Sequence, residues 1–151
     1  MNTDAIHLDT AAEIEAAEAQ AWRDLYAAAP AEFAAAAGIH TREVAGALVL
    51  HWAASGRRYF SRAIGLGVVE PATPEGIDEI IAGYREAGIS MFLLQALPHC
   101  RPGQYEQWLR VRGLRAFDAQ DRVVRWDEPL DGAGRKPRNG RNRSRRRLYE
   151  P

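Results

Sequence analysis

The sequence predicts a mixed α/β fold, in which helices flank a central mixed sheet with strands of both directions. Apolar residues recur at helical spacing in several stretches, and short runs rich in Val, Leu and Ile alternate with those stretches. The predicted order combines an antiparallel strand pair with a strand–helix–strand crossover, which requires a mixed sheet. A chain of 151 residues has room for one domain with a sizeable core.

Two helices are predicted to open the chain. Thr10 and Glu13 form a capping box that supports a helix over residues 9–29, and Pro30 ends it. The apolar stripe of this helix is predicted to be Ile14, Ala17, Ala21 and Leu25. A short alanine-rich helix is predicted over residues 31–37.

An antiparallel hairpin is predicted next. Its strands cover residues 44–54 and 59–69, and the polar segment 55–58 supplies the turn. Gly65 and Gly67 lie two residues apart in the second strand, where they would admit a close neighbour.

The third predicted helix begins at Thr73, which acts as the N-cap before Pro74, and ends at Gly88. The later predicted elements are a strand over 89–97, a helix over 104–112 and a strand or hairpin over 114–126 with its turn near 119–121. Together these elements predict one domain over residues 4–129.

The C-terminal segment has a different composition. Periodicity vanishes after Pro129, and Gly, Pro, Asn and Arg dominate. From Gly132 onward lie eight of the 20 basic residues but one of the 20 acidic residues. This asymmetry predicts a disordered basic tail over residues 130–151, attached to an acidic domain.

Composition excludes several classes of protein. A single cysteine, Cys100, excludes a fold built on internal disulfides. The N-terminus lacks the basic-then-apolar pattern of a signal peptide, and the longest apolar run, 44–54, is about half of a membrane span. We therefore expect a cytoplasmic protein with no membrane partner.

Few residues form a pattern that carries chemistry. His99 and Cys100 are adjacent, so their side chains point apart, and we expect a loop with a buried cysteine rather than a nucleophile. The four histidines lack the paired spacing of a metal site, and His51, within an apolar strand, is expected in the core or a cleft. The arginine-rich tail lacks interleaved aromatic residues, so we do not expect nucleic acid as a partner.

A longer stretch matches a known pattern. The residues concerned are Arg62–Pro71, Gly76–Ile77, Met91–Gln95, Tyr105–Leu109 and Arg112–Leu114. In this order they resemble the GNAT (acetyl-CoA-dependent N-acetyltransferase) superfamily, in particular the amino-terminal half of its tandem members. The resemblance implies transfer of an acetyl group from acetyl-CoA to a small amine or peptide acceptor by direct attack.

The resemblance also implies where a cofactor would bind. The backbone of Val68 and Val69 would pair with the pantetheine arm of acetyl-CoA. The amides of Gly76 and Ile77, at a helix N-terminus, would face the pyrophosphate, because aligned N–H groups favour an anion.

Three residues depart from the family pattern. Pro74 removes an N–H donor from the turn, and Glu75 places a negative charge beside the expected pyrophosphate. Leu109 stands where the family often has a tyrosine that acts as general acid. We therefore assign no catalytic residue, and we expect a degenerate or non-catalytic half of a tandem acetyltransferase.

Two other hypotheses stay open. The chain could be a stand-alone enzyme that binds coenzyme A in a modified way. It could instead be a non-catalytic binding module whose basic tail contacts nucleic acid. A second GNAT half or a homodimer is an expected partner under the first hypothesis, because an open sheet edge favours association.

Overall fold

A computed structural model describes residues 3–124 and 142–151, with side chains described from residue 10 to 117 and from 146 onward. The helices are α1 (Thr3–Ala27), α2 (Ala31–Ala37), α3 (Pro74–Glu86) and α4 (Tyr105–Val111). The strands are β1 (Ile39–Val44), β2 (Ala47–Trp52), β3 (Arg62–Ile64), β4 (Leu93–Ala96), β5 (Arg115–Val124) and β6 (Asn142–Glu150).

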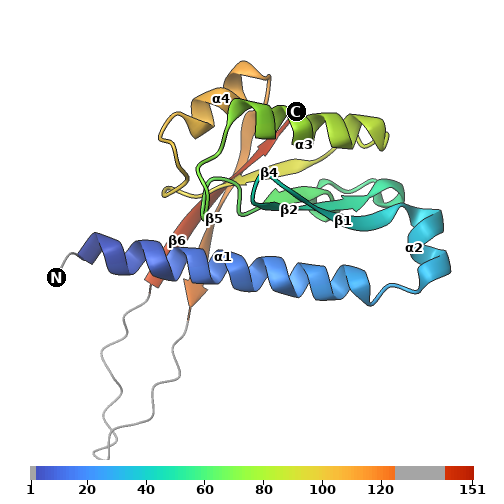
Figure 1. The fold of residues 1–151 in the computed structure, drawn as a ribbon, viewed down its shortest axis with the longest axis horizontal. Coiled ribbons are helices and arrows are strands. Elements are labelled where there is room, and N and C mark those ends of the chain that lie inside the picture. Colours follow the sequence, from blue (N-terminus) through green and yellow to red (C-terminus); the bar gives the residue numbers. More distant parts are fainter. Residues whose placement is uncertain (1–2, 125–141) are drawn as a thin grey trace, which may run out of the picture.

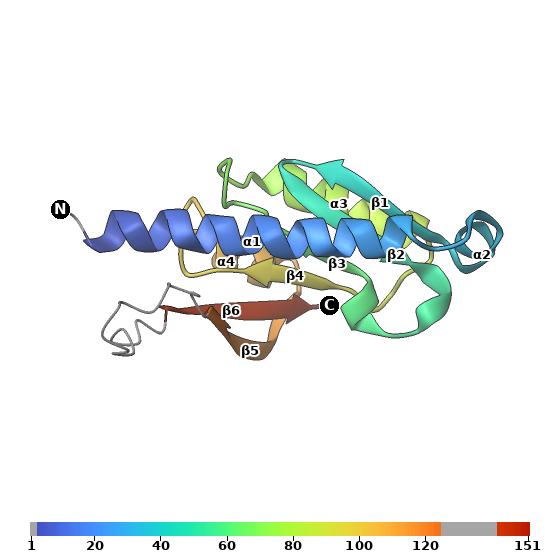
Figure 2. The same ribbon diagram turned by 90° about the horizontal axis from the view of Figure 1, so that it is seen from below.

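The six strands form one mixed sheet in the order β1-β2-β3-β4-β6-β5. Only the β3–β4 pair among them is parallel, and the other neighbours are antiparallel. Helix α1 covers one face of the sheet, and α3 and α4 cover the other (Figure 1). Figure 2, seen from below, shows α1 running across the sheet. The predicted fold class, a mixed sheet flanked by helices, is confirmed.

The hairpin begins earlier than predicted. The predicted strand 44–54 contains a turn at Ala45 and Gly46, which have positive φ angles of 50° and 77°. Two central residues with positive φ suit the twist of a tight hairpin. Strand β1, which we did not predict, therefore pairs with β2, from Val44↔Ala47 outward. The predicted antiparallel pairing of the next two strands is confirmed as β2–β3.

The predicted strand 59–69 is wrong over most of its length. A short 3-10 turn occupies Arg58–Phe60, and β3 covers only three residues. Gly65 and Gly67 then leave the extended region, with φ angles of 90° and 79°. A Cβ atom at Gly67 would lie 2.9 Å from the carbonyl oxygen of Arg101, so the expected close neighbour is present.

Helix α3 begins as predicted. The Thr73 hydroxyl accepts a hydrogen bond from the Gly76 N–H at 3.1 Å, and Pro74 occupies the first turn. Its buried residues are Gly76, Ile77, Ile80, Ile81 and Tyr84. The helix connects β3 to the parallel strand β4, with Arg62 opposite Leu93.

The face of α1 that contacts the sheet differs from the predicted stripe. Leu25, a member of that stripe, is 56% exposed, whereas Tyr26 is buried. Glu15 is also buried, at 3% exposure. The large ring of Tyr26 removes more apolar area from water than alanines do, and the sheet offers polar partners to the helix glutamates. Together, these two effects decide which face of α1 contacts the sheet, and the alanine-rich stripe does not.

The prediction of a disordered tail is wrong for residues 142–150. They form β6, which lies between β4 and β5 in the sheet. Leu148 and Tyr149 have no exposed surface. The predicted turn near 119–121 is also wrong, because β5 continues to Val124. The remainder of the predicted tail, residues 130–141, lies outside the described residues.

The core consists of two clusters on opposite faces of the sheet. The larger cluster lies beneath α3 and α4 and includes Ile77, Tyr84 and Tyr149. The smaller cluster lies beneath α1 and α2 and includes Tyr26 and Leu50. None of the helices that the structure describes is long and apolar enough to cross a bilayer.

We expect Leu148→Ala to lower the free energy of unfolding by about 2–5 kcal/mol, because it leaves a cavity inside the sheet. The matched control is Val111→Ala, which removes the same kind of group from a side chain that is 70% exposed. That control should change stability by about 0.5 kcal/mol or less. Chemical denaturation measures both, and equal small effects would show that β6 is not part of the fold.

Candidate functional site

The carboxyl ends of the parallel strands β3 and β4 meet at the same edge of the sheet. In open α/β sheets, ligands bind in the crevice outside such strand ends. Here the segments 65–73 and 97–104 leave the strands at that edge. Helix α1 passes over the face of the sheet that is opposite α3 and α4 (Figure 1). We therefore take this place as the candidate site.

The two segments are joined to each other by backbone hydrogen bonds. The N–H of Arg101 donates to the carbonyl of Gly67 at 2.8 Å, and the N–H of Ala72 donates to the carbonyl of Arg101 at 2.7 Å. The Arg101 guanidinium also donates to the carbonyl of Val69 at 2.7 Å. The backbone of Arg101 thus takes the place that an extended ligand would need beside residues 67–72.

The structure places the predicted cofactor residues outside a strand. Val68 and Val69 follow β3 in a turn, where the Val68 N–H donates to the carbonyl of Gly65 at 3.2 Å. The side chain of Val69 is 73% exposed. In α3, the N–H of Ile77 donates to the carbonyl of Thr73 at 3.1 Å, alongside the Gly76 N–H on the Thr73 hydroxyl.

These residues do not fit the pyrophosphate of acetyl-CoA. The amides of Gly76 and Ile77 already donate to Thr73, and Pro74 has no N–H. Space is also short, because a Cβ atom at Gly76 would lie 2.7 Å from the Cβ of Ala45. The negative charge of Glu75 at the same turn would further repel an anion.

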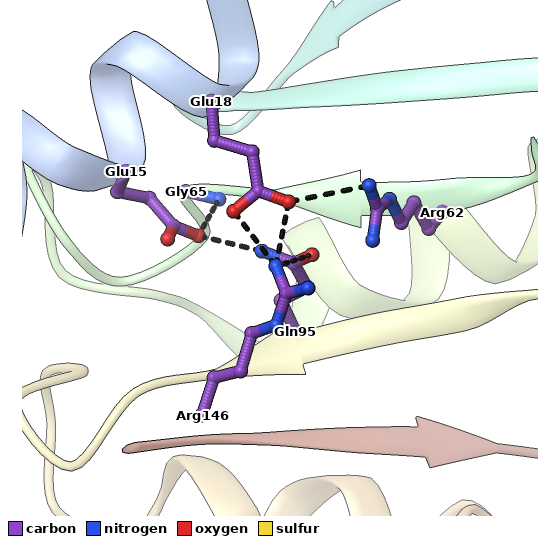
Figure 3. A network of polar contacts seen from close by, with 6 residues as sticks. All are labelled: Glu15, Glu18, Arg62, Gly65, Gln95 and Arg146. Atoms are coloured by element: carbon purple, nitrogen blue, oxygen red, sulfur yellow. Dashed lines mark hydrogen bonds and ion pairs between the residues drawn. The ribbon is translucent and has the colours of Figure 1, made fainter. Parts of the chain in front are cut away.

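A buried polar network lies on the α1 side of the same strands (Figure 3). One oxygen of Glu15 accepts hydrogen bonds from the Gly65 N–H and from the Gln95 side-chain amide, each at 3.0 Å. Glu15 and Gln95 are 3% and 1% exposed. The Glu15 carboxylate therefore links α1 to the ends of both parallel strands.

The second part of the network contains the charged pairs. Glu18 lies 3.2 Å from Arg62 and receives the Arg146 guanidinium at 2.5 and 2.7 Å. Arg146 also donates to the side-chain oxygen of Gln95 at 3.0 Å, which joins the two parts. The Arg62 guanidinium stacks 4.4 Å from the ring of Trp22. Sequence reasoning missed this network because its members lie up to 128 positions apart.

Two cavities bear on the predicted site residues. One, of about 270 Å³, lies between α1 and the β2–β3 region and is lined in part by Glu15, Glu43, Val68 and Val69. The other, of about 340 Å³, lies beside α4 and is lined in part by Leu97, Cys100, Tyr105 and Arg110. The predicted residues Val68 and Val69 therefore border a cavity, whereas Gly76 and Ile77 do not line either one.

Cys100 is not an activated nucleophile. Burial raises the pKa of its thiol to about 12, so the thiol stays protonated at neutral pH. Its sulfur accepts from the Leu97 N–H at 3.1 Å and donates to the carbonyl of Leu66 at 3.3 Å. His99 is exposed while Cys100 is buried, which confirms the expected loop with a buried cysteine.

Helix α4 carries Leu109, the position at which the resembled family often has a tyrosine. Leu109 is fully buried in the core. The nearby Tyr105 hydroxyl donates to the carbonyl of Gln95 at 3.2 Å, and burial raises its pKa well above the usual value. A tyrosine held in this way donates to the backbone and not toward a ligand.

His51 is a core residue, as predicted. It is 2% exposed, and its ring stacks on His40 at 4.3 Å and lies 4.9 Å from Tyr84. Burial, together with the charge of His40, lowers the pKa of His51 to about 4. Among the side chains that the structure describes, no group of three or more potential metal ligands is found.

We expect Arg146→Ala to lower the free energy of unfolding by on the order of 3 kcal/mol, because it breaks a largely buried charge pair. Arg147→Ala is the matched control in the same strand. Arg147 pairs with Glu106 but its side chain is 48% exposed, against 11% for Arg146. The control should lose less than about 1 kcal/mol. Denaturation curves that show equal losses would contradict the buried network.

The stability of the fold should fall in mild acid because of His51. The folded pKa is about 4, below the ordinary value of 6.5, so the folded state favours the neutral ring. This contribution is complete above pH 6.5 and is lost as the pH falls to 4, up to about 3 kcal/mol. Denaturation at several pH values should show this loss in the wild type but not in His51→Leu. Parallel pH profiles for the two proteins would refute the assignment.

Comparisons with protein-family models, with curated proteins and with solved structures found no match to this chain.

Proposed function

We propose that this chain is a GNAT-like domain with a degenerate cofactor site, which acts as the non-catalytic half of an acetyltransferase. The described elements support this, since two helices, a hairpin and a strand–helix–strand crossover follow one another as the resemblance implies. In such an assembly, the acetyl transfer from acetyl-CoA to an amine would belong to the partner half. This domain would supply a folded surface and no reacting group.

One observation carries the proposal. The backbone groups that a coenzyme A molecule would use are already bonded within the chain. Arg101 bridges Gly67 and Ala72, and Thr73 takes the amides at the start of α3. A ligand would have to break these bonds before it gained its own, so its net affinity would be low.

The competing hypotheses receive less support. A stand-alone enzyme would need a proton donor or acceptor at the site, whereas Leu109, Tyr105 and Cys100 do not supply one. A nucleic-acid-binding tail would need free basic residues. Of the basic residues of this segment, the structure describes the side chains of two, and both are paired within the molecule: Arg147 with Glu106 and Arg146 with Glu18.

Calorimetry with coenzyme A tests the proposal. The wild-type chain should give no binding heat at millimolar ligand. Glu75→Gly should strengthen binding enough to give a measurable heat at the same ligand concentration, because it removes a like charge close to the phosphates. Glu86→Gly, at the other end of α3, is the matched control and should have no effect.

Measurable binding and acetyl transfer by the wild type would refute the non-catalytic assignment. Unchanged binding in Glu75→Gly would instead show that the start of α3 is not the phosphate position. The first result concerns the activity of the wild type and the second concerns the position of the phosphates, so either can occur without the other.

A further inference from the structure

The segment between β4 and α4 is fixed at both of its ends. Leu97 and Tyr105, which flank it, are 3% and 1% exposed. Residues 98–103 between them, which we call the strap, leave the core, and most of them are exposed. A turn closes each end, because the Cys100 N–H donates to the carbonyl of Leu97 at 3.1 Å and the Tyr105 N–H donates to the carbonyl of Pro102 at 3.0 Å. The strap is therefore a short unit between two fixed points.

One side of the strap is bonded to residues 67–72 through Arg101. The N–H and the carbonyl of Arg101 each make a backbone hydrogen bond to that segment, and its guanidinium donates to the carbonyl of Val69. The thiol of Cys100 adds a bond to the carbonyl of Leu66 at 3.3 Å, and a thiol is a weak donor. Because Arg101 is exposed, water replaces its partners when its bonds break. Opening this contact therefore costs little.

The other side of the strap borders empty space. The cavity of about 340 Å³ beside α4 is lined in part by the strap residues Pro98, Cys100 and Gly103 and by the α4 residues Tyr105, Glu106 and Gln107. Residues 67–72, all of which the structure describes, are not part of this lining. The strap thus has bonded backbone on one side and a void on the other. Movement into a void meets less resistance than movement into packed side chains.

We propose that the strap is a displaceable closure of the crevice, in which residues 98–103 swing away from residues 67–72 into the cavity beside α4. The open form exposes the carbonyls of Gly67 and Val69 and the N–H of Ala72. Such groups pair with the backbone of an extended chain, a role that the strap itself fills in the closed form. This inference concerns the movement of the strap and does not rest on the function proposed for the domain.

Hydrogen exchange on the full chain measures the opening. The N–H groups of Arg101 and Ala72 report it directly, because each is bonded across the contact that opens. We expect both to exchange at a rate that low concentrations of urea leave unchanged, since a local opening exposes little surface. The N–H of Leu93, which donates to the carbonyl of the buried Ser61 at 2.9 Å, is the reference. Its exchange should rise with urea, because it requires global unfolding.

Three variants test what holds the strap closed. Arg101→Ala removes the guanidinium bond and should speed exchange at Ala72 by about fivefold or more. Arg85→Ala removes an exposed arginine from the last turn of α3, is the matched control and should leave that rate unchanged. Leu148→Ala destabilises the fold away from the strap, so it should speed exchange at Leu93 by far more than at Ala72.

Gln107→Trp tests where the strap moves. Gln107 lines the cavity from α4, so a large ring there fills space that the strap needs. Exchange at Ala72 should slow by about twofold or more, because the open form becomes overpacked. Gln104→Trp is the matched control, since Gln104 is exposed and lies outside the lining of this cavity. It should leave the rate unchanged.

The proposal is overturned if exchange at Arg101 and Ala72 rises with urea in parallel with Leu93, because the strap then opens only by global unfolding. Equal rates in Arg101→Ala and Arg85→Ala would remove the bonding role of Arg101 and the proposal with it. Equal rates in Gln107→Trp and Gln104→Trp would exclude the cavity as the destination. Circular dichroism checks that each variant folds, and where one does not, the urea dependence of the wild type decides alone.

Discussion

The contact between Glu18 and Arg146 is the interaction on which the arrangement of the domain depends. It joins the first helix to the last strand, across 128 positions of sequence, and its two side chains are 17% and 11% exposed. Through Gln95 it continues to Glu15, and through Glu18 it continues to Arg62. Buried charges of this kind require all of their partners, since a lost partner leaves an uncompensated charge.

Part of the uneven distribution of charge along the chain is balanced within the fold. Strand β6 places two of its arginines beside acidic side chains from α1 and α4. Arg146 reaches Glu18, and Arg147 and the Tyr149 hydroxyl reach Glu106. Over residues 142–150, what looks in sequence like a solvated tail is a strand of the sheet.

The crevice at the ends of β3 and β4 is closed by the chain itself. On one face the glutamates of α1 use the polar groups of the strand ends, and at the edge Arg101 uses the backbone of the neighbouring segment. The carbonyl of Gly67 and the N–H groups of Ala72, Gly76 and Ile77 therefore have internal partners.

The sequence by itself determined several elements of this protein through local signals. The Thr73-Pro74 cap, the alanine-rich α2, the crossover to β4 and the buried His51 follow from spacing and turn chemistry, which act between near neighbours. Only the tertiary structure decided the rest. The face of α1, the turn hidden at Ala45, the strand β6 and the occupied amides of Gly76 and Ile77 all depend on partners distant in sequence. No local pattern records such partners, because a buried carboxylate or arginine is stable only once the opposite charge has been brought to it by the fold.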